Sequence, residues 1–195
     1  MVKVDYITNK FFNSRTYVLS NELNDYVWLV DCGDIDEVIE TLVKDKRVEG
    51  VLMTHTHADH LYGLNRLLEL FPQARIFTNT FGAVALSDSR LNITKYHSEV
   101  PDFEITHKDN VVVVDEGELI ELFEGVSAEV FLTTGHDASC LTYKVDKNLF
   151  TGDAYIPGIP VVAKFPKSNK KQASISESRI KALAEGLIVC PGHSM

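Results

Sequence analysis

Apolar and polar side chains alternate along the first thirty residues, with the two-residue period of a half-buried strand. Turn-forming residues at 13–14 and 21–25 interrupt this alternation, and the three resulting segments are centred near Val4, Val18 and Leu29. The pattern predicts a three-stranded meander at the beginning of the chain.

Apolar residues three and four positions apart indicate amphipathic helices further along. The spacing predicts helices over residues 34–43, 61–71 and 174–184, and Pro72 stops the second of them. A further helical turn or two is expected within residues 79–87. Each helix has an apolar face, so each must pack against another element.

Short apolar or alternating runs predict the remaining strands. They cover residues 50–54, 74–77, 111–114, 119–123, 128–133, 140–145, 148–151 and 187–190. The apolar residues within 91–108 show no periodicity, which indicates a long surface segment that could cover another part of the molecule. Strands with interspersed helices occur twice and no linker divides them. We therefore expect one α/β domain over residues 1–195, with two sheets and the helices outside.

The composition, with 45% apolar residues among 195, is that of one globular domain with a sizeable core. Lys and Arg number 19 against 28 Asp and Glu, and the net charge of −9 argues against a nucleic-acid partner, because phosphate binding needs a basic surface. No apolar run approaches the roughly 20 residues that cross a bilayer, which argues against a membrane protein. The opening residues MVKVDYITNKFF lack the pattern of a secretory signal, so we expect a cytoplasmic location.

The three cysteines, Cys32, Cys140 and Cys190, are widely separated along the chain. Their odd number and the absence of a CxxC pair argue against a disulfide framework or a structural zinc knuckle. We expect three buried thiols that take no part in the chemistry.

Potential metal ligands are most concentrated in His55-Thr56-His57-Ala58-Asp59-His60, between a predicted buried strand and a predicted helix. Residues two apart in an extended chain point the same way, so His55 and His57 can offer imidazoles to one cation. The turn into the helix carries Asp59 and His60 toward a neighbouring position, so one loop can serve two metal ions. The alternative is that Asp59 caps the helix and His60 lies on the surface of its first turn.

Three more predicted strands end in a glycine followed by a potential ligand. The pairs are Gly135-His136, Gly152-Asp153 and Gly192-His193. Each residue alone could belong to an ordinary loop or turn. Because a site built from loops lies along one edge of its scaffold, the four strand ends together predict a shared metal site.

In this order, the motifs resemble those of the metallo-β-lactamase-fold hydrolases, and the resemblance runs from residue 2 to residue 194. Asp31-Cys32-Gly33 is similar to the opening motif of that family. The resemblance implies a four-layer αβ/βα sandwich with its metals in a groove along one edge. It also implies that Asp31 orients the ligand loop through hydrogen bonds, although this residue could equally form a turn before Gly33.

The resemblance further implies two metal sites. Their ligands would be His55, His57 and His136 for one metal, Asp59, His60 and His193 for the second, and Asp153 as a bridge between them. Imidazole and carboxylate ligands accept several divalent ions. We expect two ions, with zinc favoured and iron or manganese as alternatives.

Two divalent cations about 3.5–4 Å apart lower the pKa of a shared water enough to supply hydroxide near neutral pH. Hydrolysis is therefore the expected reaction. Asp59 would be the catalytic residue, because a ligand that also contacts the metal-bridging hydroxide can orient it and shuttle its proton.

The bridging Asp153 is more similar to the glyoxalase-II-like branch than to true β-lactamases, here without the helical C-terminal extension of that branch. This implies a small-molecule substrate with an ester or thioester bond, and it implies substrate contacts from Tyr155, Lys164 and Phe165. Residues 155–165 are mostly apolar and could form one wall of the groove opposite residues 91–108, or could pack on the neighbouring sheet.

Three other functions stay open on the sequence alone. A persulfide dioxygenase of the same family would hold a single iron by two His and one Asp and would consume oxygen. A phosphodiesterase is disfavoured by the net charge of −9. A non-catalytic metal-binding domain normally has a closed site, whereas this ligand set leaves room for solvent. The oligomeric state is not predicted.

Overall fold

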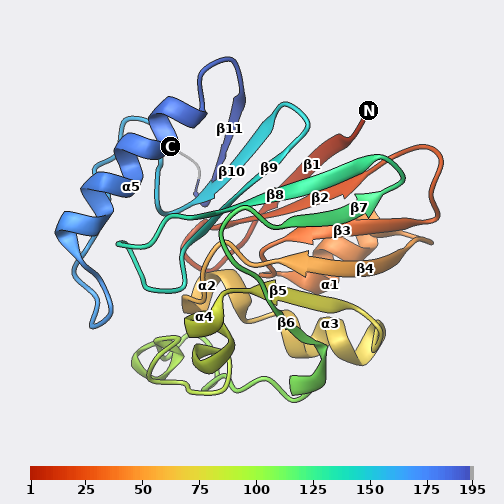
Figure 1. The fold of residues 1–195 in the computed structure, drawn as a ribbon. Coiled ribbons are helices and arrows are strands. Elements are labelled where there is room, and N and C mark those ends of the chain that lie inside the picture. Colours follow the sequence, from red (N-terminus) through yellow and green to blue (C-terminus); the bar gives the residue numbers. More distant parts are fainter. Residues whose placement is uncertain (194–195) are drawn as a thin grey trace.

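Two β-sheets pack face to face in the computed structural model, which describes residues 1–193 (Figure 1). The first sheet consists of β1 (Lys3–Thr8), β2 (Arg15–Ser20), β3 (Tyr26–Val30), β4 (Arg47–Leu52), β5 (Arg75–Thr78) and β6 (Val111–Val113), in that spatial order. The second has the order β11 (Ile188–Pro191), β10 (Asn148–Gly152), β9 (Leu141–Val145), β8 (Val126–Leu132) and β7 (Leu119–Phe123).

Both sheets are mixed. The first three strands form the predicted antiparallel meander, and β4, β5 and β6 continue it in parallel. In the second sheet, β7 to β10 are antiparallel and β11 runs parallel to β10. Parallel neighbours require crossover connections, and the helices supply them.

The helices cover the outer faces of the two sheets (Figure 1). The helical segments are α1 (Ile35–Val38), η1 (Ile39–Val43), α2 (Ala58–Leu61), α3 (Leu64–Leu70), α4 (Thr80–Ala85), η2 (Thr94–Tyr96), η3 (Lys108–Asn110) and α5 (Lys170–Leu183). Those from α1 to α3 pack on the first sheet through one apolar cluster, and α5 packs on the second through Ile180. The four-layer αβ/βα sandwich is therefore confirmed.

The core between the sheets is made by inward-facing residues of both. Trp28 from the first sheet and Tyr143 from the second are fully buried there. The indole Nε1–H of Trp28 donates to the backbone oxygen of Leu122 at 2.8 Å, and the Tyr143 hydroxyl donates to that of Met53 at 3.0 Å. Each aromatic side chain thus buries a large apolar area while its polar atom keeps a partner, and together they fix how the sheets face each other.

Two predicted helices differ from the structure. The helix predicted over residues 61–71 begins later, as α3 at Leu64, because Leu61 belongs to the separate short helix α2. Between the two helices the backbone bonds to residue 32 instead: Gly63 N–H donates to the oxygen of Cys32 at 3.0 Å, and Cys32 N–H donates to that of His60 at 2.8 Å. A Cβ at Gly63 would collide with the backbone oxygen of Gly33, so this close approach requires glycine. The first predicted helix is a single α-helical turn, α1, that continues as the π-helical η1.

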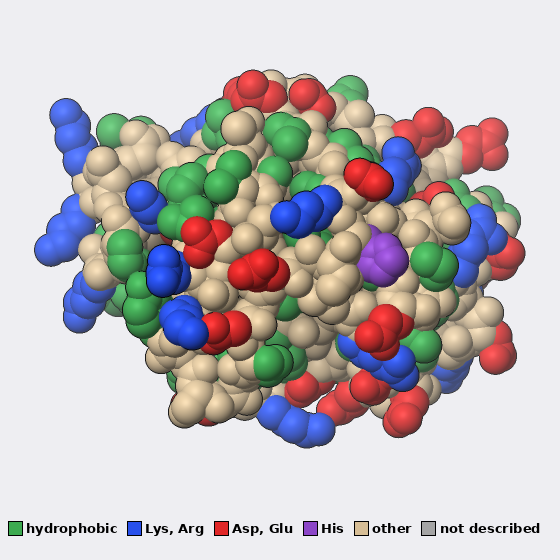
Figure 2. Space-filling view, turned by 90° about the horizontal axis from the view of Figure 1, so that it is seen from below, with side chains coloured by type: hydrophobic (Ala, Val, Ile, Leu, Met, Phe, Trp, Pro, Cys, Tyr) green, Lys and Arg blue, Asp and Glu red, His purple; other side chains and the backbone are tan. Residues whose placement is uncertain are grey.

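Residues 91–108, predicted as a covering surface segment, are anchored to the layer of helices. The buried Asn92 side chain donates to the backbone oxygens of Ala85 and Phe103, both at 3.0 Å, and Phe103 and Ile105 join the apolar cluster beneath. On this face of the molecule, acidic and basic side chains are interspersed (Figure 2). All three cysteines are free and buried, as predicted.

Within residues 1–193, no helix has both the length and the apolar character needed to cross a membrane. The longest helix, α5, has 14 residues and carries several charged side chains. The prediction that no segment of the chain crosses a bilayer as a helix therefore holds for the described residues.

Candidate metal centre

The residues of the HTHADH motif are held at the end of β4 by a buried carboxylate. Asp31, which follows β3, accepts hydrogen bonds from the backbone N–H and the hydroxyl of Thr54, both at 2.7 Å. Because β3 and β4 are parallel neighbours, their ends lie side by side, and Asp31 ties the two together. The loop after Thr54 is thereby fixed before its histidines begin.

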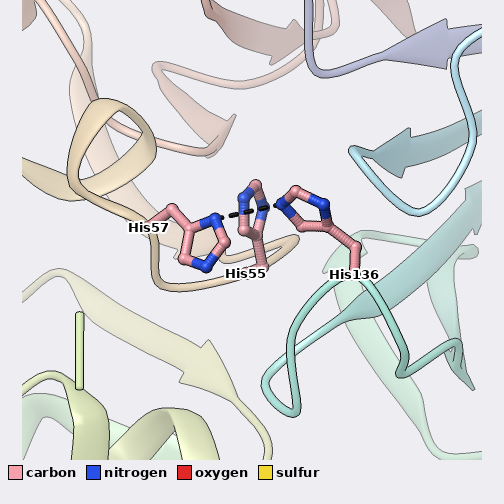
Figure 3. Close-up of side chains that lie close together, drawn as sticks. All are labelled: His55, His57 and His136. Atoms are coloured by element: carbon pink, nitrogen blue, oxygen red, sulfur yellow. Dashed lines mark hydrogen bonds between the residues drawn. The ribbon is translucent and has the colours of Figure 1, made fainter. Parts of the chain in front are cut away.

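Three histidines converge from two loops. His55 and His57 from the HTHADH motif and His136 from the loop after β8 bring one ring nitrogen each to within 4.8 Å of one another, and the three rings point inward (Figure 3). His136 Nε2 lies 3.0 Å from His57 Nδ1. All three side chains are buried, so the cluster is a compact group of imidazoles shielded from solvent.

A second cluster lies beside the first. Asp59 and His60 from the same motif meet His193, which follows β11. His60 Nε2 and His193 Nε2 are each 3.3 Å from Asp59 Oδ2, and 3.3 Å from each other. Asp59 and His60 therefore lie in the site, not on an exposed surface of helix α2.

Asp153, at the end of β10, lies between the two clusters. Its Oδ2 is 3.6 Å from His136 Nε2 in the first cluster and 3.3 Å from His193 Nε2 in the second. Its Oδ1 is 3.6 Å from His60 Nε2 and has no hydrogen-bond partner within residues 1–193. This carboxylate therefore lies near histidines of both clusters.

On three of the imidazoles, the outward-facing nitrogen has a partner within hydrogen-bond distance. Backbone oxygens can only accept, so His136 Nδ1–H donates to Val162 at 2.6 Å and His193 Nδ1–H donates to Phe12 at 3.0 Å. His60 Nδ1 lies 2.9 Å from Asp31 Oδ2. A neutral imidazole has a proton on only one nitrogen, so the inward-facing Nε2 of His136 keeps a free lone pair, whereas those of His60 and His193 face the carboxylate of Asp59.

The outward-facing nitrogen of His55 has the Thr54 hydroxyl as its partner. Its Nδ1 lies 3.2 Å from the Thr54 hydroxyl, whose proton is already donated to Asp31, so the imidazole must be the donor. This leaves His55 Nε2 unprotonated, buried and without a hydrogen-bond partner among the described residues. Such an atom is costly unless something outside the chain engages it.

Asp137 orients His57, and the sequence analysis did not identify it. Its Oδ2 lies 3.6 Å from His57 Nε2, and its Oδ1 accepts from the backbone N–H and the hydroxyl of Ser139 at 2.8 and 2.5 Å. Ser139 in turn accepts from the backbone N–H of Thr56 at 2.9 Å. The only signal in the sequence was that an acidic residue directly follows His136.

The two clusters differ electrostatically. Burial lowers the pKa of His55 well below its ordinary value and lowers that of His136 to about 4, so these rings are neutral. In the second cluster, the neighbouring carboxylates outweigh burial and raise the pKa of His60 well above its ordinary value and that of His193 to about 9. The same contacts hold the pKa of Asp59 below its usual range, although burial opposes this.

Glycine is required next to His193. A Cβ at Gly192 would collide with Asp153 Oδ1 and come within 2.9 Å of His60 Cε1. The backbone of β11 can approach the two clusters this closely only because residue 192 has no side chain.

The arrangement fits divalent metal ions. His136 Nε2 has a free lone pair, because the proton of that ring is on Nδ1, and it lies 3.0 Å from His57 Nδ1, so a proton or a cation lies between the two atoms. His55 Nε2 and Asp153 Oδ1 are buried acceptors without partners within residues 1–193, and both adjoin these clusters. Imidazole nitrogens and carboxylate oxygens are ligands for zinc, iron and manganese.

The three residues predicted to contact substrate are not all found together. Phe165 lies against the first cluster, with its ring centre 4.5 Å from that of His57 and 5.4 Å from that of His136. Tyr155 and Lys164 instead line a cavity of about 830 Å³ between residues 155–164 and α5. A much smaller hollow beside His136 and Asp153 shares the loop but is not lined by Tyr155 or Lys164.

Residues 10–193 match the family model of the metallo-beta-lactamase superfamily. A curated relative, the hydroxyacylglutathione hydrolase of Salmonella paratyphi A, is 26% identical over 184 residues, which are 94% of this chain and 62% of the relative. That of Francisella philomiragia is 28% identical over 151 residues, which are 71% of this chain and 50% of the relative. The chain thus spans between one half and about 62% of the length of these relatives.

Solved structures share the fold at lower identity. The BLEG-1 B3 metallo-beta-lactamase superposes with a TM-score of 0.88 at 21% identity, covering 99% of this chain and 92% of that one. TTHA1623 in a di-iron-bound form superposes with a TM-score of 0.80 at 19% identity, covering 98% and 92%. With its matching family model, its two mixed sheets and its His/Asp clusters, this chain belongs to the metallo-beta-lactamase superfamily, whose members are mostly metal-dependent hydrolases.

Proposed function

We propose that this chain is a dinuclear metal-dependent hydrolase that cleaves a small ester or thioester. The observation that carries the proposal is the position of Asp153, whose two oxygens face both clusters. His55, His57 and His136 would hold one ion, and Asp59, His60 and His193 would hold the other, with Asp153 as the bridge. We propose zinc for both ions, with iron as the alternative, since the di-iron form of TTHA1623 has the same fold.

Two divalent ions held by these residues would supply a hydroxide near neutral pH and a positive charge for the developing oxyanion. The chain's own residues do the rest. Asp59, buried and ionised beside His60 and His193, orients the attacking oxygen and takes its proton. The water oxygen forms a C–O bond to the carbonyl carbon, the C–S or C–O bond to the leaving group then breaks, and the proton taken by Asp59 passes to the leaving group, which yields a carboxylic acid and a thiol or an alcohol.

The chain's contacts on the outward side of the rings keep this arrangement rigid. Asp31, Asp137 and the backbone oxygens of Phe12 and Val162 hold the rings so that the inward nitrogens keep their lone pairs. Preorganised groups of this kind need no rearrangement as charge develops in the transition state.

The thioester preference rests on the hydroxyacylglutathione hydrolases among the relatives. We propose that residues 1–195 act as a single domain on a small molecule in the cytoplasm, without a nucleic-acid partner. The net charge of −9 supports the last point.

The test combines metal analysis of the purified protein with a panel of thioesters, esters, lactones and bis-p-nitrophenyl phosphate. We expect two ions per chain and the highest kcat/KM on a thioester or an ester. One iron per chain with oxygen uptake on a persulfide would indicate a dioxygenase, and higher activity on the phosphodiester would indicate a phosphodiesterase. Two bound ions with no turnover of any substrate would indicate a metal-binding domain without catalysis.

A further inference from the structure

The cavity of about 830 Å³ between residues 155–164 and α5 is a second concave site of this chain. Its volume lies in the range of ligand pockets, about 300–1,000 Å³. The loop that forms one wall also lines the small hollow beside His136 and Asp153, whereas α5 forms the other wall. None of the proposed metal ligands lines the cavity. It therefore adjoins the metal centre but has a separate set of side chains.

The loop wall of the cavity is preformed. Residues 156–159 form a turn in which the last backbone N–H donates to the first backbone oxygen at 3.1 Å. Proline and glycine occupy its two central positions, and Gly158 has the φ of +80° that a type II turn requires at this place. Further along, the backbone oxygen of Val162 accepts from His136 Nδ1–H at 2.6 Å. The wall is thus held at its turn and near its end without a ligand.

This wall is apolar and partly open to solvent. Tyr155, Ile156 and Val161 line the cavity together with Ile159 and Val162. The last two side chains are 40% and 44% exposed. Exposed apolar surface gathered in one place is typical of an interaction site. An apolar ligand that covers this wall gains free energy, because it removes apolar surface from water.

Positive charge gathers around the same cavity. Lys164, Lys170 and Lys181 line it, and Glu177 is the one acidic side chain among the described residues that do so. Lys181 Nζ pairs with Glu177 at 2.7 Å, whereas Lys164 and Lys170 form no ion pair within residues 1–193. Two ammonium groups therefore keep an uncompensated charge at this place, in a chain whose net charge is −9. A local positive field of this kind attracts anions.

We infer that the cavity is a second ligand site and binds an aliphatic chain with an anionic head group. The chain lies along the apolar loop wall, and the head group lies at Lys164 and Lys170. Lysine suits this role, because its ammonium group is a compact charge that can donate to a carboxylate or a phosphate. The site goes beyond the proposed hydrolysis and does not depend on it, since the residues proposed for the reaction do not line the cavity.

The test is a calorimetric titration of the metal-loaded protein with decanoate, decanol and acetate, each below the concentration at which it forms micelles. Acetate lacks the chain, and we expect it to bind at least about 100-fold more weakly than decanoate, because each buried CH₂ strengthens binding. Decanol lacks the charge, and we expect it to bind about tenfold more weakly. Decyl phosphate in place of decanoate shows which anionic head group the lysines prefer.

The charge of the site is tested by the double variant Lys164→Gln with Lys170→Gln. We expect it to bind decanoate about tenfold more weakly and to bind decanol as the wild type does. The matched control is Lys167→Gln with Lys171→Gln. These two lysines are exposed in the same segment and do not line the cavity, so the control has the same change of net charge. We expect it to keep the wild-type affinity for decanoate.

The space of the site is tested by Ser174→Trp, which fills part of the cavity without a change of charge. Ser174 is exposed on α5 and lines the cavity, whereas Ser178, one turn further, is exposed and does not line it. We expect Ser174→Trp to abolish the binding of both decanoate and decanol, and Ser178→Trp to leave it unchanged. If Ser174→Trp fails to fold, the lysine variants decide the outcome.

Three results would overturn the site. Equal affinities for decanoate and acetate would show that the apolar wall holds no chain. An equal loss of affinity in the two double variants would show that net charge alone attracts the anion. An unchanged Kd in both Lys164→Gln with Lys170→Gln and Ser174→Trp would place the ligand elsewhere, for example on the ions of the metal centre. None of these titrations needs turnover, so the proposed hydrolysis can fail without affecting the site.

Discussion

Asp137 Oδ2 lies 3.6 Å from His57 Nε2, on the side of the imidazole away from the nitrogen that faces His136. Asp31 has the same relationship to His60, at 2.9 Å. Each cluster therefore contains one imidazole that a buried carboxylate orients from behind. Such outer contacts decide which ring nitrogen keeps its lone pair.

Asp137→Asn is expected to weaken metal binding at the first cluster. Ser139 donates its N–H to Oδ1, so the asparagine oxygen stays on that side and its NH₂ turns toward His57 Nε2. An NH₂ group there favours a proton on Nδ1, the atom that faces the other histidines. We expect about a 10–100-fold loss of affinity for one of two ions, measured by competition with a chromophoric chelator.

The comparison variant is Asp31→Asn, which should weaken metal binding at the second cluster by the same mechanism. Asp109→Asn, at an exposed position, is the control for a change of charge alone. If Asp137→Asn binds both ions as tightly as the control, the orientation of His57 does not depend on Asp137.

Removal of metal is expected to destabilise the fold. Without a cation, the buried His55 Nε2 and Asp153 Oδ1 have no partner among the described residues, and protonated His60 and His193 must replace the charge of the ions. An ion at 100 times its Kd stabilises the native state by about 2.7 kcal/mol. We therefore expect the unfolding midpoint in calorimetry to fall after dialysis against a chelator and to return when the ion is added back. A midpoint that is indifferent to chelator and ion would argue against binding at these clusters.

Asp59→Asn should remove most of the hydrolysis while the fold stays intact. The backbone oxygen of Asp59, which accepts from Ser14, is unchanged by the substitution, and the amide has the same shape as the carboxylate. The substitution removes the ionised carboxylate next to the reacting oxygen. Removal of a general acid–base group typically lowers the rate by about 10²–10⁴-fold. Steady-state kinetics and circular dichroism check the two halves of this prediction, and an unchanged kcat would exclude Asp59 as the catalytic residue.

Gly192→Ala is expected to disrupt the centre through shape alone. The added methyl group would overlap Asp153 Oδ1 and press on His60, so one of the two clusters must shift. We expect loss of metal and of activity together. Gly117→Ala is the control: its Cβ would meet nothing within 4 Å, and its positive φ should cost about 1 kcal/mol of stability without loss of activity.

Much of the centre was predictable because its residues follow strand ends. The alternating first strands and the apolar runs placed Asp31, the HTHADH motif, Asp153 and His193 after strands, and the structure brings these ends to one edge. Their proposed roles as ligands follow from that placement. Hydrophobic periodicity is a local signal, and it suffices to place residues that directly follow a strand.

Other features depend on contacts that no local pattern contains. Between α2 and α3, the backbone of His60 and Gly63 bonds to Cys32 instead of continuing the helix, while the leucine spacing stays helical. The contact of Asp137 with His57 depends on how Ser139 joins two loops. Residues 155–165 lack periodicity, so the sequence could not separate Phe165, which reaches the histidines, from Lys164, which faces α5.

The hydrogen bond between His193 and Phe12 closes a loop of 181 residues. Contacts between such distant positions form late, because closing a long loop costs entropy before the contact offers any gain. The contacts of Asp59 and His60 with His193 are therefore expected to form only after both sheets have assembled. Capture of the second ion then becomes a late event of folding, and a time-resolved metal signal would mark the moment at which the native topology is complete.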